Sequence, residues 1–246
     1  MVQSGFAHLV FEVLAYAAGF RLYLWQRRRA GDVIDTHARW TVIAAAIGGA
    51  ALGSRLLYWL EDPQLTLAHW REFSYLFGGK TVVGGLIGGW IAVETTKRVA
   101  GITSRTGDLF AVPLAVAIAI GRVGCQLAGL ADQTYGTPTT MPWGVDLGDG
   151  VLRHPAVLYE AAALVVLAVV LTRAQRRPHV NGDIFKGFMA GYMAIRVVVD
   201  AFKVGHIVLF GMTTIQIAAL AVVAYYADDV RRWMRNFRHR QAPTRR

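Results

Sequence analysis

The sequence predicts an all-α, polytopic membrane protein with seven transmembrane helices, its amino terminus outside and its carboxyl terminus in the cytoplasm. Three observations predict this. The 246-residue chain is 54% hydrophobic with a mean hydropathy of +0.38, whereas soluble domains are about 45–50% apolar. Apolar runs of roughly the length that a bilayer requires recur along the chain. Basic residues gather in alternate gaps between these runs.

Seven apolar runs are the predicted spans. A transmembrane helix needs about 20 mostly apolar residues. Each run should be helical, because a helix satisfies its own backbone hydrogen bonds within lipid. The predicted spans cover approximately residues 5–25, 39–60, 81–99, 108–129, 154–172, 184–203 and 207–227. The first is expected to be a retained span, because the opening residues lack the basic leader and cleavage site of a removable signal peptide.

The distribution of charge predicts the orientation. The gaps after the first, third and fifth spans, together with the carboxyl tail, hold 17 Lys and Arg residues, whereas the other gaps hold four. Basic residues favour the cytoplasmic side. We therefore expect a membrane domain over residues 1–230, with external loops at 61–80 and 130–153, and a basic cytoplasmic tail at 231–246.

The net charge of +10 raises the question of a nucleic-acid partner. We expect none, because the basic residues lie where topology signals lie, and the tail is suited to the acidic headgroups of membrane lipids. Cys125 is the single cysteine, so no internal disulfide forms. No metal or cofactor is predicted, because the spacing of the cysteine and histidines indicates no ligand set. Five histidines are assigned no chemistry: His8, His37, His69, His179 and His206.

Several charged residues fall within the predicted spans. Arg122, Glu160 and Arg196 each lie about 9 Å below an outer span end, and Arg55 about 7.5 Å, at 1.5 Å per residue. A charge at a bilayer centre costs about 2.5–3.5 kcal/mol on insertion scales, so such residues are functional or paired. We interpret Arg122 and Arg196 as binding the phosphate of an anionic phospholipid. The alternative is that each arginine pairs with Glu160, Asp200 or a carbonyl, and for Arg55 we favour this alternative.

Two further groups belong to the same region. Arg196 and Asp200 are spaced i, i+4 and share a helix face, so Asp200 is expected to orient the arginine; Lys203 lies one turn nearer the water. The segment GGKTVVGGLIGGW, which contains Gly84 and Gly85, indicates close helix packing. Glycine backbone also permits a lipid glycerol unit to approach, and both interpretations can hold together.

Four motifs resemble those of the prolipoprotein diacylglyceryl transferase family: GGLIGG (84–89), GRVGC (121–125), RHPAVLYE (153–160) and GYMAIRVVVDAFK (191–203). The resemblance implies seven spans in the bacterial plasma (inner) membrane. It also implies transfer of a diacylglyceryl group from phosphatidylglycerol to the thiol of a lipobox cysteine in a lipoprotein precursor, at the outer face.

The resemblance assigns roles to individual residues. Arg122 and Arg196 match the family's essential arginines, and Asp200 and Lys203 stand where the family has Glu and Arg. His154, Tyr159 and Glu160 fit its HPxQLYE motif. The chain also departs from the family pattern at three positions. Val83 replaces the histidine of HGGL, and Cys125 replaces the asparagine that follows GRxG. Leu130 stands where the family has an acidic residue, and Asp132 follows two residues later.

These assignments predict a site and leave alternatives open. Arg122, Arg196 and His154 are the predicted catalytic residues, with Asp132 and Glu160 as further candidates for the base. The predicted substrate-binding residues are Gly84, Gly85, Asp132, Tyr159, Glu160, Asp200 and Lys203. His154 can instead be a helix-start residue that holds the loop, and Cys125 a small packing residue. The rival functions are a catalytically silent phospholipid-binding protein and an enzyme with another acceptor; a transporter is less favoured.

Overall fold

The computed structural model describes residues 2–241, and most of them are helical. The helices are α1 (Val2–Ala30), α2 (Thr36–Glu61), α3 (Pro63–His69), α4 (Phe73–Gly78), α5 (Val82–Val99), α6 (Asp108–Ala128), the 3-10 helix η1 (Gly129–Asp132), α7 (Ala156–Gln175), α8 (Asp183–Asp200), α9 (Thr214–Tyr225) and α10 (Ala227–Gln241). Two short antiparallel hairpins pair β1 (Val145–Asp146) with β2 (Leu152–Arg153), and β3 (Ile207–Leu209) with β4 (Met212–Thr213).

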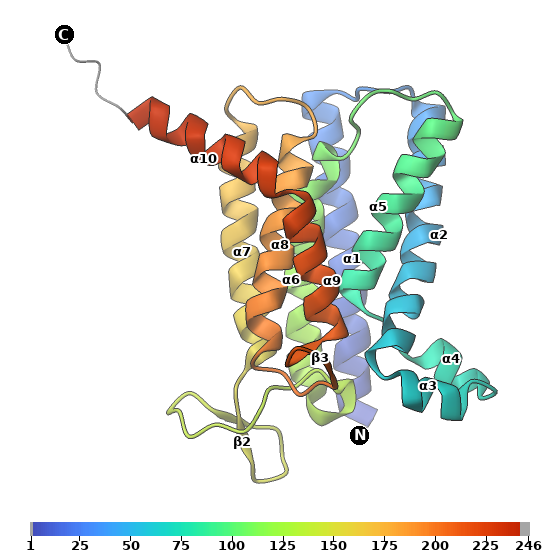
Figure 1. Ribbon diagram of the computed structural model, residues 1–246, viewed down its shortest axis with the longest axis vertical. Helices are drawn as coiled ribbons and strands as arrows, with labels where there is room; N and C mark the ends of the chain where they lie inside the picture. The colour runs from blue at the N-terminus through green and yellow to red at the C-terminus, as the bar shows by residue number, and fades with distance from the viewer. Residues whose placement is uncertain (1, 242–246) are drawn as a thin grey trace.

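The long helices run side by side along the long axis of the molecule (Figure 1). Helix α6 packs against α1, α7 and α8; α8 also packs against α7 and α9, and α2 pairs with α5. The amino terminus, α3, α4 and both hairpins lie at one end of the bundle, and α10 lies at the other. The short helices α3 and α4 and both hairpins therefore lie at the end where α6 finishes and α7 begins.

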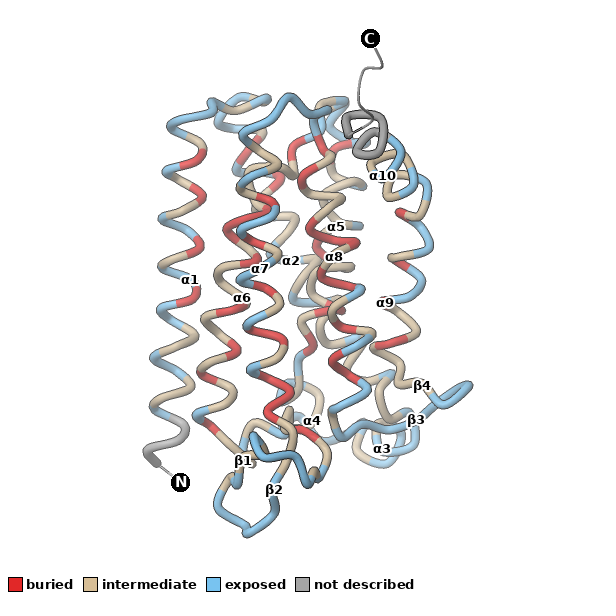
Figure 2. The backbone as a smooth tube through the Cα atoms, turned by 90° about the vertical axis from the view of Figure 1, so that its left-hand side faces the viewer, coloured by how far each residue is buried: buried red, intermediate tan, exposed pale blue. Residues whose placement is uncertain are grey.

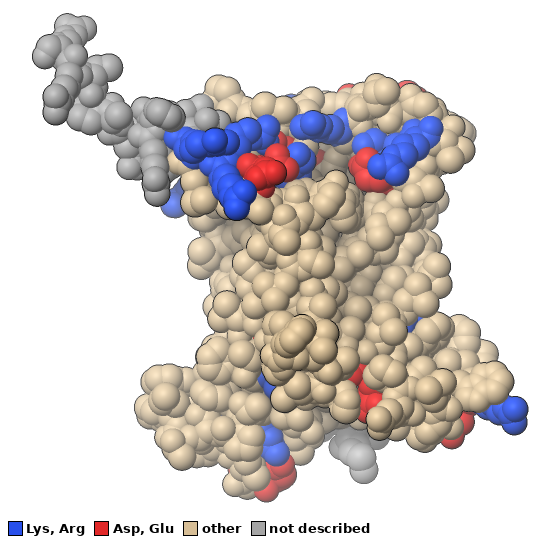
Figure 3. Space-filling model, in the orientation of Figure 1, with Lys and Arg blue, Asp and Glu red and all other residues tan. Residues whose placement is uncertain are grey.

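Four helices within the described residues are long and apolar enough to cross a membrane: Phe6–Ala30, Thr36–Glu61, Asp108–Asp132 and Ala156–Gln175. Helices α5 and α8 are shorter, with 18 residues each. On the face shown in Figure 3, a belt without charged side chains separates a strongly basic end from an end with fewer charges. These features are those of an all-α membrane protein.

The predicted span at 207–227 is wrong in its first third, residues 207–213. Residues 207–213 form the β3–β4 hairpin, whose turn places Phe210 and Gly211 at positive φ. The helix begins only at Thr214, because Thr213 and Gln216 form a capping box that satisfies free backbone groups at the helix start. Helix α9 therefore has 12 residues.

The predicted loop and tail also contain helices. The segment 61–80 holds α3 and α4, and Asp62 caps α3 by accepting a hydrogen bond from the Leu65 amide. In the predicted tail at 231–246, the residues up to Gln241 belong to α10. The last five residues, 242–246, lie outside the described part of the chain.

Close packing of α2 on α5 explains the glycine-rich segment. A Cβ atom added at Gly84 would lie 2.3 Å from the Gly53 carbonyl oxygen, and one at Gly88 would lie 2.3 Å from the Gly49 oxygen. Small residues at a spacing of four allow this approach of two helix backbones. The packing interpretation is therefore confirmed for Gly84.

The buried core lies mainly between α6, α7 and α8, as Figure 2 shows by the buried residues on their facing sides. Leu164 on α7 packs with Phe188, Met189 and Met193 on α8, and all four side chains are fully buried. This apolar layer continues into a buried polar group on the same three helices.

Candidate functional site

Glu160 on α7 is the centre of this polar group. Its side chain is fully buried, with 0% exposure. The Tyr192 hydroxyl donates a hydrogen bond to Oε1 at 2.8 Å, Arg196 Nη1 donates to both oxygens at 3.1 and 3.2 Å, and Lys203 Nζ donates to Oε2 at 2.7 Å. A buried carboxylate is stable only when its charge and lone pairs are satisfied, and these partners do so.

Arg122 reaches the same carboxylate from α6. Its Nε lies 2.9 Å from Glu160 Oε1. The two groups form an ion pair, but this nitrogen makes no hydrogen bond to the oxygen. Its Nη1 faces Cys125 Sγ at 3.9 Å. Arg122 and Arg196 are only 7% and 4% exposed. The two arginines predicted from separate spans therefore meet at one carboxylate.

Asp200 completes the group from α8. Its Oδ1 accepts a hydrogen bond from Arg196 Nη2 at 2.6 Å and lies 4.0 Å from Lys203 Nζ. The predicted orienting contact between Asp200 and Arg196 is thus present. We call Arg122, Glu160, Arg196, Asp200 and Lys203 the charge cluster. Its three cations and two carboxylates leave one formal positive charge.

The charge cluster also has free hydrogen-bonding capacity. Arg196 Nε and Asp200 Oδ2 are buried and have no hydrogen-bond partner among the described residues, and Arg122 Nε makes only its ion pair with Glu160. Buried polar atoms without partners are uncommon and often indicate a functional group or a bound molecule. Guanidinium groups bind phosphate with paired, charge-assisted hydrogen bonds. The arrangement is therefore suited to an anionic oxygen-rich ligand.

The loop before α7 closes over the adjacent end of α8. The Thr137 amide donates to the Phe202 carbonyl at 2.8 Å, and the His154 amide donates to the Thr137 carbonyl at 2.9 Å. Gly136 pairs with Lys203 across an isolated bridge. A Cβ atom at Gly136 would lie 2.0 Å from the His154 carbonyl oxygen, so only glycine fits there.

His154 lies on this loop, just before α7. Its Nδ1 is 3.3 Å from the Tyr159 hydroxyl, and its ring packs edge-on against Phe202 with centroids 5.1 Å apart. Trp143 Nε1 donates to the same Tyr159 hydroxyl at 2.7 Å. His154 therefore holds the loop through its backbone, as the helix-start alternative proposed. Its role as a base remains a prediction.

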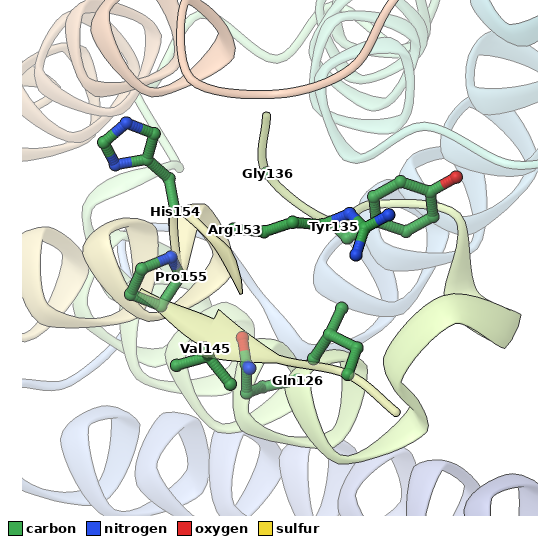
Figure 4. A pocket seen from close by; sticks show the side chains of 8 residues that line it. Gln126, Tyr135, Gly136, Val145, Arg153, His154 and Pro155 are labelled. Carbon is green, nitrogen blue, oxygen red and sulfur yellow. The ribbon is translucent and has the colours of Figure 1, made fainter. Parts of the chain in front are cut away.

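A small depression borders His154 under the β1–β2 hairpin (Figure 4). It is lined by Gln126, Tyr135, Gly136, Val145, Leu147, Arg153, His154 and Pro155. Arg122 and Arg196 do not line it. The depression beside His154 is thus lined by residues outside the charge cluster.

The remaining candidates lie elsewhere. Arg55 Nη1 donates to the Gly79 carbonyl at 2.8 Å, which confirms the pairing alternative for this arginine. Val83 is buried in the core with 0% exposure. Gly85 has space around it, with no atom closer than 3.6 Å to an added Cβ. Asp132 lies in η1 with its Oδ1 3.5 Å from His8 Nδ1, and within the described residues no hydrogen bond or ion pair joins it to Glu160 or the two arginines.

Sequence reasoning missed two residues of this region. Tyr192 donates to Glu160, and its spacing of i, i+4 to Arg196 would have placed it on the same helix face. His8 approaches Asp132 from α1, and no local pattern indicates this, because the two residues are far apart in the chain.

The fold and the charge cluster define a helical membrane protein with a buried, net cationic site suited to an anionic lipid. The family model for prolipoprotein diacylglyceryl transferase matches residues 6–227, and the chain belongs to this family. It is accordingly an enzyme of the transferase class, and the resemblance read from its motifs is confirmed.

Relatives named phosphatidylglycerol–prolipoprotein diacylglyceryl transferase are similar to most of the chain. The protein from Bordetella parapertussis is 32% identical over 205 residues, which cover 80% of this chain and 75% of the relative. The protein from Rhodospirillum centenum is 30% identical over 249 residues, covering 90% and 86%. The protein from Streptomyces griseus is 31% identical over 242 residues, covering 89% and 70%.

Proposed function

We propose that this protein transfers a diacylglyceryl group from phosphatidylglycerol to the thiol of a lipobox cysteine in a lipoprotein precursor. Family membership and the names of the relatives support the reaction. The observation that supports assigning the reaction to particular residues is that Arg122 and Arg196, on two different helices, both contact Glu160. We assign the lipid phosphate to these two guanidinium groups.

We further propose seven spans, with the amino terminus outside, in the bacterial inner membrane. Helices α1, α2, α5, α6, α7 and α8 are six of the proposed spans. The seventh is the apolar helix α9, which with 12 residues is shorter than the roughly 20 residues that a full crossing needs. The excess of Lys and Arg at the end that carries α10 supports a cytoplasmic location for that end. The hairpins and the charge cluster then belong to the outer half of the molecule, where outer-leaflet lipid enters.

The proposed reaction is a displacement at the glycerol carbon. The acceptor thiolate forms a C–S bond with this carbon while the C–O bond to phosphate breaks, and glycerol 1-phosphate leaves. Negative charge then builds on the leaving phosphate, and Arg122 and Arg196 stabilise it. Preorganised donors of this kind supply a large share of many rate enhancements.

The thiol proton needs an acceptor, and His154 is the proposed base. Glu160 is less suited to this role, because its two oxygens already bind three cations and the Tyr192 hydroxyl. We instead propose that Glu160 and Asp200 position the cations. Asp132 stays a second candidate base.

A silent phospholipid-binding protein is the second candidate function. The buried valine at position 83 favours it, because this side chain can neither accept nor donate a proton. The same site with another acceptor is a related possibility within the transferase class.

Complementation of bacteria depleted of their own transferase tests the proposal. We expect the parent chain to restore growth, and Arg122→Ala and Arg196→Ala variants produced at equal levels to fail. Binding of phosphatidylglycerol without rescue would favour the silent binder. Rescue by both arginine variants would contradict the assignment of the site.

A further inference from the structure

A second polar group lies beside the charge cluster. His8 on α1, Cys125 on α6 and Asp132 in η1 each offer one metal-binding atom, and these atoms lie within 4.8 Å of one another. We propose that His8, Cys125 and Asp132 form a binding site for a thiophilic divalent cation, with Zn²⁺ as the best match.

The separation of the histidine and aspartate donor atoms suits a single ion, and the thiol lies within 4.8 Å of both. Zinc bonds of about 2.0–2.3 Å in tetrahedral geometry place neighbouring donors roughly 3.3–3.8 Å apart. His8 Nδ1 lies 3.5 Å from Asp132 Oδ1. The same Nδ1 is buried and has no hydrogen-bond partner among the described residues. This nitrogen faces a carboxylate oxygen and lies close to a thiol. A cation can therefore bind between the three groups.

Carboxylate and hydroxyl groups flank the two outer ligands. His8 Nε2 faces Glu12 Oε2 at 3.9 Å, and Lys80 Nζ donates to the other Glu12 oxygen at 2.6 Å. Metal-binding histidines commonly have a carboxylate near their second nitrogen. The Thr134 hydroxyl donates to Asp132 Oδ2, which leaves Oδ1 for the ion.

The chemistry of the ligands selects the kind of ion. A thiolate with an imidazole favours zinc over magnesium or calcium, which prefer oxygen ligands. Three protein ligands leave a fourth position open, as in catalytic rather than structural zinc sites. Arg122 Nη1 lies 3.9 Å from Cys125 Sγ, so the ion would lie next to the charge cluster without using any of its carboxylates.

Cobalt(II) titration of the full chain tests this proposal. The protein is purified with a histidine-free tag, stripped with chelator and titrated with Co²⁺, which reports thiolate ligation by a charge-transfer absorption band. Cys125 is the only cysteine, so the band reports on this site alone. We expect one equivalent of Co²⁺ with the band, displacement by Zn²⁺, and slower alkylation of Cys125 when Zn²⁺ is bound.

Matched variants make the result specific. Cys125→Ser should abolish the band, and His8→Ala and Asp132→Asn should each weaken binding at least tenfold. His206→Ala, an exposed histidine outside the group, should bind as the parent does. Absence of a band in the parent, unchanged binding in Cys125→Ser, or Cys125 alkylation that Zn²⁺ does not slow would overturn the site. None of these readouts requires lipid transfer, so they leave the proposed function untouched.

Discussion

Arg122 and Arg196, which are on different helices, share one oxygen of Glu160, with Arg122 Nε at 2.9 Å and Arg196 Nη1 at 3.1 Å. Two guanidinium groups would repel each other at this separation without the carboxylate between them. Glu160 therefore holds both arginines in place, and the proposed phosphate site depends on it.

Glu160→Gln should destabilise the protein strongly. The substitution keeps the side-chain shape but leaves three buried cations with one carboxylate, and breaking a buried ion pair costs about 3–5 kcal/mol. We expect a lower unfolding temperature in detergent. Glu94→Gln is the matched control, because Glu94 is 41% exposed and, within residues 2–241, its one ion pair is with Lys97. An equal effect of both substitutions would contradict the central role of Glu160.

Arg122→Lys and Arg196→Lys should each lower kcat by roughly 10²–10³-fold, the usual effect of removing one transition-state donor. Lysine keeps the charge but loses the planar fork that reaches phosphate while bound to Glu160. Initial rates of transfer from phosphatidylglycerol measure this. Arg55→Lys should keep the parental rate, since Arg55 contacts the Gly79 carbonyl. Parental rates in the two cluster variants would remove these arginines from the reaction.

His154→Gln should lower the transfer rate by roughly 10²–10⁴-fold if His154 is the general base. The rate of the variant should then rise with pH, because hydroxide takes over proton removal. His206→Gln serves as the control on an exposed histidine. If His154 only holds the loop, the variant will instead lose thermal stability, and its pH profile will follow that of the parent.

Gly84→Ala should destabilise the α2–α5 pair by about 1–3 kcal/mol, the usual cost of overpacking. The added methyl group meets the Gly53 carbonyl oxygen at 2.3 Å. Gly48→Ala, also within a helix, meets nothing within 4 Å and should stabilise by about 0.5–1 kcal/mol. Opposite signs of the two changes in unfolding temperature are expected; equal signs would contradict the packing interpretation.

Asp32, in the loop between α1 and α2, should make stability depend on pH. Burial raises the pKa of Asp32, but the hydrogen bond and charge of Arg39 outweigh this, so the pKa lies below its usual value of 3.8. A carboxyl group whose pKa is lower in the folded than in the unfolded protein stabilises the fold when the pH is above the unfolded-state pKa. This stabilisation is lost as the pH falls through the folded-state pKa. The difference in unfolding temperature between the parent and Asp32→Asn should be largest near neutral pH and shrink below about pH 4. A difference independent of pH would contradict this.

Much of the site is predictable from the sequence, because a charged residue within a transmembrane segment is costly and is therefore functional or paired. Arg122, Glu160 and Arg196 are charged residues within apolar runs, and the rise of 1.5 Å per helical residue predicts that they lie at one depth in the membrane. The spacing of Arg196 and Asp200 predicted their pairing. Glu160 was predicted to contact substrate, yet it is fully buried beneath its partners; only the packing of three helices determines which charges meet.

Two parts of the structure were not predictable from local pattern. The β3–β4 hairpin takes the place of the first third of a predicted helix, because hydropathy does not distinguish an apolar hairpin from a span when a capping box follows. The group of His8, Cys125 and Asp132 forms only when α1 packs along α6, and residues so far apart carry no ligand spacing.

Mass spectrometry of a lipobox peptide incubated with the purified protein and phosphatidylglycerol tests whether this protein transfers the diacylglyceryl group. We expect a mass increase of one diacylglyceryl group on the cysteine with release of glycerol phosphate. We also expect loss of both products in folded Arg122→Ala and Arg196→Ala variants. An unmodified peptide with the parent protein, or equal modification by the parent and both variants, would contradict it.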